Sequence, residues 1–177
     1  MKKIVSLLMI LSMLFAVSIT KAEADTTDTF TITVTCNFIE IVLKDTPGTS
    51  DYTTWALGTV ALSNVSTMTS GQGVRVVLGT TSQNVDIQSK GATSSPDSWT
   101  IAASAGSNVY KLICDGTNEA AVTDFSSATT LTTDYQDINN ATATQADRYL
   151  YYKFTAPSTV STGSQQTITI SVQAIAS

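Results

Sequence analysis

The clearest pattern in the chain is a strict alternation of apolar and polar residues near its start. In residues 29–36 every odd position is Thr, while Phe30, Ile32 and Val34 are apolar and Cys36 continues their phase. Residues 167–174 repeat the pattern, with Thr, Ser or Gln alternating with aliphatic side chains. A period of two is typical of a strand with one buried and one wetted face, and β-branched Thr suits the wetted face. Both segments are therefore predicted to be half-buried β-strands.

The same alternation recurs between these two segments, separated by Gly, Pro, Asn and Asp turn signals. Residues 119–147 lack a clear period and are predicted to form a long loop with one irregular strand near Thr130. No segment has a convincing helical period. The pattern predicts an all-β fold, an Ig-like or jelly-roll β-sandwich of about nine antiparallel strands. Their expected positions are 29–36, 38–43, 55–62, 74–78, 85–89, 99–102, 109–114, 149–155 and 165–175.

Residues 1–24 have the layout of a secretory signal peptide rather than of a folded element. Lys2 and Lys3 precede an uncharged, mostly apolar run over residues 4–19, and the sequence Ala-Glu-Ala at 22–24 fits a cleavage site. The apolar run is shorter than the roughly 20 residues of a membrane-spanning helix. We expect cleavage after Ala24 or after Ala22, a single domain over residues 25–177 with no membrane span, and export from a bacterial cell to the medium or the cell surface.

The amino-acid composition excludes the catalytic mechanisms that depend on histidine. The chain of 177 residues contains no His, so it has no imidazole base, no Ser-His or Cys-His couple and no His-based metal site. Beyond residue 24, the remaining 153 residues carry 6 basic and 13 acidic side chains, a net charge of −7. An acidic surface is a poor match for nucleic acid or anionic lipid. The expectation is a protein that is not an enzyme and does not bind nucleic acid.

Two cysteines occur in the chain, and export would place both in an oxidising compartment. Cys36 falls in phase with the apolar side of its predicted strand, and Cys114 falls in phase with Tyr110 and Leu112. A Cys36–Cys114 disulfide is therefore expected, and in the chain-entropy model it would stabilise the fold by about 4 kcal/mol. The alternative is a pair of buried free thiols.

Carboxylates and amides remain as candidate ligands and acids. Asp134, Asp137 and Asn139 present oxygen atoms at a spacing that suits Ca²⁺, although turn-forming residues explain the same cluster. The acids Glu40, Asp115 and Glu119 have no pairing typical of a glycoside hydrolase and are expected to be solvated. Apart from this possible Ca²⁺ site, no cofactor is expected. Trp55 and Trp99 each precede an aliphatic residue by two positions, which favours core packing over a sugar-binding platform.

The order of these segments resembles secreted bacterial Ig-like or jelly-roll surface proteins, among them subunits of extracellular fibres and pili. The resemblance is carried by the Thr-rich opening strand, the Trp-Ala-Leu-Gly segment at 55–58, and Ala-Pro-Ser-Thr at 156–159 leading into the alternating residues 166–172. Residues 98–102 also resemble one motif of the WxL cell-wall-binding domains, but no second Trp follows Trp99. The resemblance implies a β-sandwich at the cell exterior.

Three functions remain. The first is a structural protein of the cell exterior, a self-assembling surface or filament subunit whose residues Phe30, Ile32 and Val34 complete a neighbour's sheet by strand addition. For that strand, the alternative is pairing within its own sheet. The second function is a carbohydrate-binding or adhesive module acting on surface glycans through residues 119–147, with Ca²⁺ assistance. The third, a secreted glycan-active enzyme, requires two carboxylates in one cleft with shifted pKa values.

Overall fold

A computed structural model describes residues 31–33, 39–79, 83–121, 124–143 and 146–177. The chain divides into two units, Met1–Thr35 and Cys36–Ser177. In the first unit the described residues 31–33 form no strand, and the side chain of Ile32 is 72% exposed. Phe30 and Val34 lie outside the described residues, as do the predicted signal peptide and its cleavage site.

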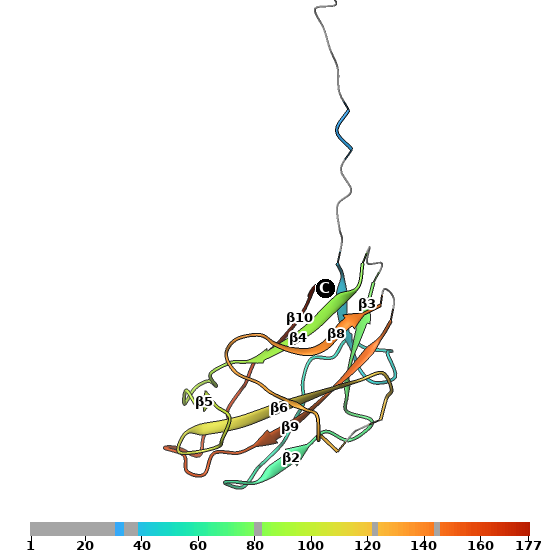
Figure 1. Cartoon of the computed structure of the whole chain (residues 1–177). Coiled ribbons are helices and arrows are strands. Elements are labelled where there is room, and N and C mark those ends of the chain that lie inside the picture. The colour runs from blue at the N-terminus through green and yellow to red at the C-terminus, as the bar shows by residue number, and fades with distance from the viewer. Residues whose placement is uncertain (1–30, 34–38, 80–82, 122–123, 144–145) are drawn as a thin grey trace, which may run out of the picture. The chain divides into compact units, whose positions relative to one another are not determined.

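The described part of the second unit is all-β, with ten strands in two sheets and no helix, consistent with a β-sandwich (Figure 1). Within the described residues no helix is therefore present to cross a membrane. The larger sheet has the strand order β1-β3-β9-β6-β5, with β2 also paired to β9 and β7 to β6. Its strands are β1 (Ile41–Lys44), β2 (Val65–Thr67), β3 (Val74–Leu78), β5 (Thr100–Ile101), β6 (Val109–Thr117), β7 (Thr129–Thr130) and β9 (Arg148–Thr155).

The smaller sheet has three strands in the order β10-β4-β8: β10 (Ile170–Ala176), β4 (Val85–Gly91) and β8 (Gln136–Thr142). Both pairings are antiparallel, and the β4–β8 register shifts around Ile87. Its outer face carries a row of amides, in which Gln173 donates to Gln88 and Gln88 donates to Asp137, each at 2.6 Å. These polar contacts explain why this face can remain wetted while the opposite face is buried.

The core lies where the inward faces of the two sheets meet. Strand β3 alternates buried and half-buried side chains through its five residues, and β4 does the same through its seven. The alternation in the sequence thus becomes a division between core and surface. The buried side chains come from both sheets and include Val76, Leu78, Val85, Ile87, Tyr110, Leu112, Cys114, Leu150, Tyr152 and Phe154.

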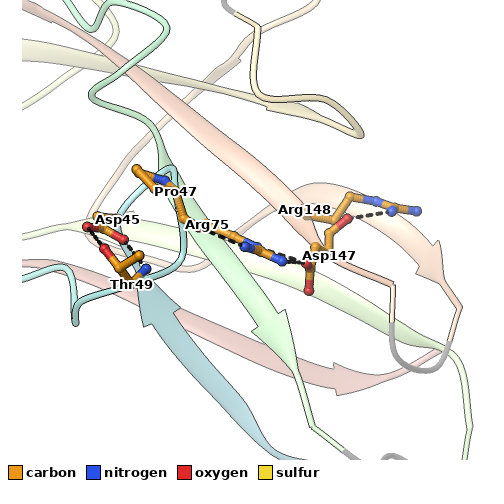
Figure 2. A network of polar contacts seen from close by, with 6 residues as sticks. All are labelled: Asp45, Pro47, Thr49, Arg75, Asp147 and Arg148. Carbon is orange, nitrogen blue, oxygen red and sulfur yellow. Dashed lines mark hydrogen bonds and ion pairs between the residues drawn. The ribbon is translucent and has the colours of Figure 1, made fainter.

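In the larger sheet, charged side chains link β3 to the residue that precedes β9 (Figure 2). Arg75 on β3 donates through Nε and a terminal nitrogen to Asp147 Oδ2, with the Nε contact at 2.8 Å, and this interaction raises the pKa of Arg75. In the neighbouring turn, Asp45 Oδ1 accepts from the backbone N–H groups of Thr49 and Ser50. These hydrogen bonds, led by the one from Ser50, lower the pKa of Asp45.

Several predicted strands are confirmed, and others need correction. Segments 74–78, 85–89, 109–114 and 149–155 all lie in strands, and the irregular strand near Thr130 is β7. The strand predicted at 38–43 is found at β1, and the last strand begins five residues later than predicted. Strands β2 and β8 were not predicted, and β5 pairs with β6 in parallel rather than antiparallel.

The strand predicted at 55–62 is wrong. These residues form no strand, although Trp55 and Leu57 pack against the core as their spacing suggested, and Val60, which is out of phase with them, packs there too. Of the strand predicted at 29–36, the described residues 31–33 form none, and the rest lies outside the described residues. The error at 55–62 has a physical cause: Gly58 has a φ of +64° and residue 59 is a bend, so the backbone does not stay extended, and none of the described backbone pairs with residues 55–60.

Candidate binding groove

A groove with a volume of about 850 Å³ opens between the two sheets, and we call it the inter-sheet groove. Its apolar lining comes from the inward faces of strands in both sheets. The larger sheet contributes Leu43, Val74, Leu112 and Phe154, and β10 contributes Ile170 and Val172. The same side chains belong to the hydrophobic core or pack against it. The groove therefore leaves part of the core unfilled, which forfeits packing contacts and apolar burial.

One wall of the inter-sheet groove is segment 53–60, which bends at residue 59, next to Gly58 with a φ of +64°. At its ends, Tyr52 N–H donates to Leu43 O at 2.9 Å, and Ser63 N–H donates to Pro157 O at 2.9 Å. Between these anchors, residues 53–60 make no backbone hydrogen bond to any described residue. The segment thus holds apolar side chains against the core while its backbone donors and acceptors have no ladder partner among the described residues.

The opposite wall is formed by residues 160–168 and continues into β10. Gln166 holds this wall in place: its Oε1 accepts from Ser94 Oγ at 2.7 Å and from Asp97 N–H at 3.0 Å, and its Nε2 donates to Asp97 Oδ2 at 2.7 Å. A two-way backbone bridge joins Thr167 to Ser95. Beyond it, β10 pairs with β4 on one side, and within the described residues its other edge has no strand partner.

Aromatic side chains also line the inter-sheet groove. Tyr52, Trp55 and Trp99 are each half-buried, and all three pack against the core. The expected core packing of the two tryptophans is thus observed together with exposure to the groove. Burial raises the pKa of Tyr52, so its phenol is neutral at physiological pH. The wall of the groove is therefore aromatic and uncharged at these positions.

Cys114 lies on β6 with its side chain fully buried, as its phase in the sequence predicted, and it is a free thiol in the structure. Burial raises its pKa far above the ordinary thiol value, so the group is protonated. The neighbouring Tyr152 hydroxyl lies 3.0 Å from Ser89 Oγ, and burial also raises the pKa of Tyr152. Cys36 lies outside the described residues, so the Cys36–Cys114 disulfide stays a prediction.

The three residues proposed for Ca²⁺ have separate partners. Asp134 lies in an exposed bend, where its backbone N–H contacts Thr132 Oγ1. Asp137 accepts from Gln88 on the outer face, whereas Asn139 Nδ2 donates to Gly116 O on β6 at 3.3 Å. The described residues hold no cluster of three or more His, Cys, Asp or Glu side chains suited to a metal ion. The Ca²⁺ site stays a prediction without an assembled geometry.

Among the carboxylates, Asp115 has the most unusual environment. It is 6% exposed, its Oδ2 has no hydrogen-bond partner, and burial raises its pKa, with a smaller contribution from Asp124. The backbone N–H of Gly116 partly offsets this shift. Asp124 has a lowered pKa because Ser126 donates hydrogen bonds to it. Neither acid lines the inter-sheet groove.

The sequence pattern did not reveal the inter-sheet groove as a site. One signal was present, because Trp55 and Leu57 have the spacing of a strand, but only the tertiary structure shows that residues 55–60 have no backbone partner among the described residues. No family model, curated protein or solved structure matches this chain. What the chain does is therefore inferred from its groove and its sequence.

Proposed function

We propose that this chain is a secreted, non-catalytic structural protein of the bacterial cell exterior, which self-associates as a subunit of a surface filament. The observation that carries the proposal is the inter-sheet groove. Its lining joins buried core side chains such as Leu112 and Phe154 to half-buried ones such as Val172. An apolar groove of this kind is typical of a surface that binds another polypeptide.

Energetics favour filling the groove. Burying one fully exposed Val, Leu, Ile or Phe side chain contributes about 1.5–3 kcal/mol, and part of this gain is still available at the 53% exposed Leu62 and at the half-buried Ile170 and Val172. A contact between one surface of a copy and a different surface of the next is heterologous, and it generates an open filament when its rotation does not close a ring. Repeated filling of the groove by a second copy therefore provides a route to a fibre without catalytic residues.

An Ig-like or jelly-roll sandwich with a Cys36–Cys114 disulfide is part of this proposal. Burial of Cys114 on β6 supports it, because that position is shielded from reductants. In the intact mass of the exported protein, the bridge lowers the mass by two hydrogen atoms relative to the reduced sample. An unchanged mass after reduction would remove the disulfide from the proposal.

The test of self-association uses light scattering coupled to size exclusion, with negative-stain electron microscopy, on the mature protein. We expect wild type to form concentration-dependent oligomers or filaments. The Val172→Glu variant places a charge on the groove face of β10 and is expected to stay monomeric. Ser171→Glu, one residue earlier on the same strand, is the matched control and is expected to assemble.

Circular dichroism of both variants establishes that each is folded before their assembly is compared. Assembly of Val172→Glu to the same extent as wild type would overturn the role of the groove. A wild-type protein that stays monomeric at every concentration and ionic strength would overturn the proposed function itself.

A second candidate function is a carbohydrate-binding or adhesive module, and the aromatic lining by Tyr52, Trp55 and Trp99 favours it. Aromatic faces stack on sugar rings, and the Thr-rich walls offer hydroxyl groups beside them. A glycan array with the mature protein, with and without Ca²⁺, tests this function. Binding that is lost in Trp55→Ala would support it, and an array without signal would exclude the glycans presented.

A further inference from the structure

We propose that the inter-sheet groove is also a binding site for a neutral lipid-like molecule, whose alkyl chain lies along the groove and whose single uncharged oxygen group binds the hydroxyl of Tyr52. Long-chain primary alcohols are the simplest members of this ligand class. Because one groove cannot hold two occupants, a bound ligand competes with the second copy. This competition rests on the proposed function, whereas the site itself goes beyond it.

The lining of the inter-sheet groove carries no charge. None of the described residues that line it is Asp, Glu, Lys or Arg, although the 153 residues beyond residue 24 include 6 basic and 13 acidic side chains. Moving an ionised group from water into an apolar site without a partner charge is strongly unfavourable. The groove therefore selects against fatty acid anions, phospholipid headgroups and acidic glycans, and it accepts an uncharged ligand.

Apolar side chains of the groove retain exposed surface that a ligand can cover. Six aliphatic residues of the lining pack against the core but are only half-buried: Leu43, Leu57, Val60, Ile168, Ile170 and Val172. Contact with an alkyl chain removes this surface from water, which drives hydrophobic binding. A sugar ring brings several hydroxyl groups for which these side chains provide no hydrogen bond. The aliphatic part of the lining therefore suits an alkyl chain better than a sugar.

The size of the groove fits one such molecule. Sites for small organic ligands typically have volumes of about 300–1,000 Å³, with an apolar lining and a few polar groups that orient the ligand. The groove, with its volume of about 850 Å³, lies within this range. Water fills about 30 Å³ per molecule, so the empty groove has room for on the order of 25–30 waters. An alkyl chain displaces part of this water from the aliphatic lining.

Tyr52 supplies a polar group for the ligand. Its half-buried side chain lines the groove, and its hydroxyl makes no hydrogen bond to a described residue. By contrast, the hydroxyl of Tyr152, which also lines the groove, already lies 3.0 Å from Ser89 Oγ. A protonated phenol both donates and accepts hydrogen bonds. Tyr52 can therefore bind an alcohol, ester or ketone oxygen.

Fluorescence displacement on the mature protein tests the site, at a dilution where light scattering reports monomer. The probe is the neutral fluorophore N-phenyl-1-naphthylamine, and the competitors are octanol, nonanol and decanol. Trp55 and Trp99 are the two tryptophans of the chain and both line the groove, so energy transfer from them to the probe reports binding there. We expect Kd to fall about fourfold for each added methylene, which corresponds to about 0.8 kcal/mol per buried CH₂ group.

Matched ligands and variants test the lining. Decanoate has the chain length of decanol but carries a carboxylate at neutral pH, and we expect it to bind at least about tenfold more weakly. Tyr52→Phe is expected to weaken decanol binding by about two- to tenfold, with the dependence on chain length unchanged. Val172→Glu is expected to abolish probe binding. Ser171→Glu, outside the lining, is expected to bind the probe as wild type does.

Three results would each overturn the inference. The first is an affinity that does not depend on the length of the alcohol. The second is decanoate binding as tight as that of decanol, and the third is wild-type probe binding in a folded Val172→Glu variant. Displacement of the probe by neutral oligosaccharides but not by decanol would also overturn it, in favour of the glycan-binding function.

Assembly assays separate this inference from the proposed function. Saturating decanol is expected to shift wild-type assembly to higher protein concentration, because ligand and second copy exclude each other. Unchanged assembly with decanol bound would overturn the groove as the contact between copies and leave the ligand site standing. Assembly without decanol binding would overturn the ligand site and leave the proposed function standing. Failure of both binding and assembly would overturn both proposals.

Discussion

Gly116→Ala is expected to destabilise the fold through a steric clash between the sheets. Gly116 lies on β6 of the larger sheet and faces β8 of the smaller one. A Cβ atom there would collide with Asn139 Oδ1 and would lie 2.7 Å from Ile138 Cγ2. Both neighbours lie within β8, and Asn139 also donates to the Gly116 carbonyl. Relief of the clash therefore requires the Asn139 amide to rotate, which gives up its hydrogen bond to Gly116, and the β-branched Ile138 to shift away from β6.

The magnitude follows from two opposing effects. Forcing an added methyl group into a packed interface costs about 1–3 kcal/mol. Replacing Gly by Ala lowers the conformational entropy of the unfolded chain, which stabilises the folded state by about 0.4–1 kcal/mol where the native backbone tolerates Ala. The expected net loss in the free energy of unfolding is about 1–2 kcal/mol. For a domain of this size the loss lowers Tm by roughly 2–8 °C.

Urea unfolding followed by tryptophan fluorescence measures this loss, since Trp55 and Trp99 both pack against the core. Gly71→Ala is the matched control, because a Cβ at Gly71 meets no atom within 4 Å. We expect the control to keep the wild-type midpoint within about 0.5 kcal/mol. Coincident midpoints for the two alanine variants would refute the close approach of β6 and β8 at Gly116.

The remaining predictions concern buried and paired polar groups. Burial raises the pKa of Asp115, so the ionised carboxylate destabilises the folded state more and more as pH rises through that raised pKa. Asp115→Asn is therefore expected to stabilise the protein by about 1 kcal/mol at pH 7 and to lose this advantage below about pH 4. Urea unfolding across pH measures the difference. An Asp115→Asn variant less stable than wild type at pH 7 would contradict the unpaired carboxylate. Arg75→Met breaks the Arg75–Asp147 pair and is expected to lower the free energy of unfolding by roughly 0.5–1.5 kcal/mol. A double-mutant cycle with Asp147→Asn, repeated in high salt, measures the coupling energy between the two side chains. A coupling energy of zero at low salt would exclude a stabilising pair. Tyr110 donates to Ala92 O at 2.6 Å and burial raises its pKa to about 12, so Tyr110→Phe is expected to lower the free energy of unfolding by about 1 kcal/mol, and an unchanged urea midpoint would argue against this hydrogen bond.

Alternation predicted the strands whose two faces differ most in burial. Val74, Val76 and Leu78 recur at every second position, and all three are buried on β3. Strand β8 escaped prediction because Gln136–Thr142 contains one large aliphatic residue, Ile138, and its pairing with β4 is irregular. Its existence depends on the backbone edge that β4 offers, which no local pattern encodes.

The candidate site was less predictable for a related reason. Trp55 and Leu57 have the spacing of a strand, but Gly58 adopts a φ of +64°, and pairing is a property of the whole fold. The groove depends on how segment 53–60 packs against the two sheets, which no local pattern encodes. By contrast, the phase of Cys114 is a local property, and its burial followed the prediction.

The two walls of the inter-sheet groove come from segments about a hundred residues apart, 53–60 and 160–168, and its floor includes strands from both sheets. The β4–β10 pair likewise joins residues that are far apart in sequence. Such distant contacts form late and slowly during folding, so the groove is absent from partly folded chains. If the groove is the contact between copies, as proposed, an incompletely folded or damaged copy cannot bind the next one. Only copies that have finished folding then add to the fibre.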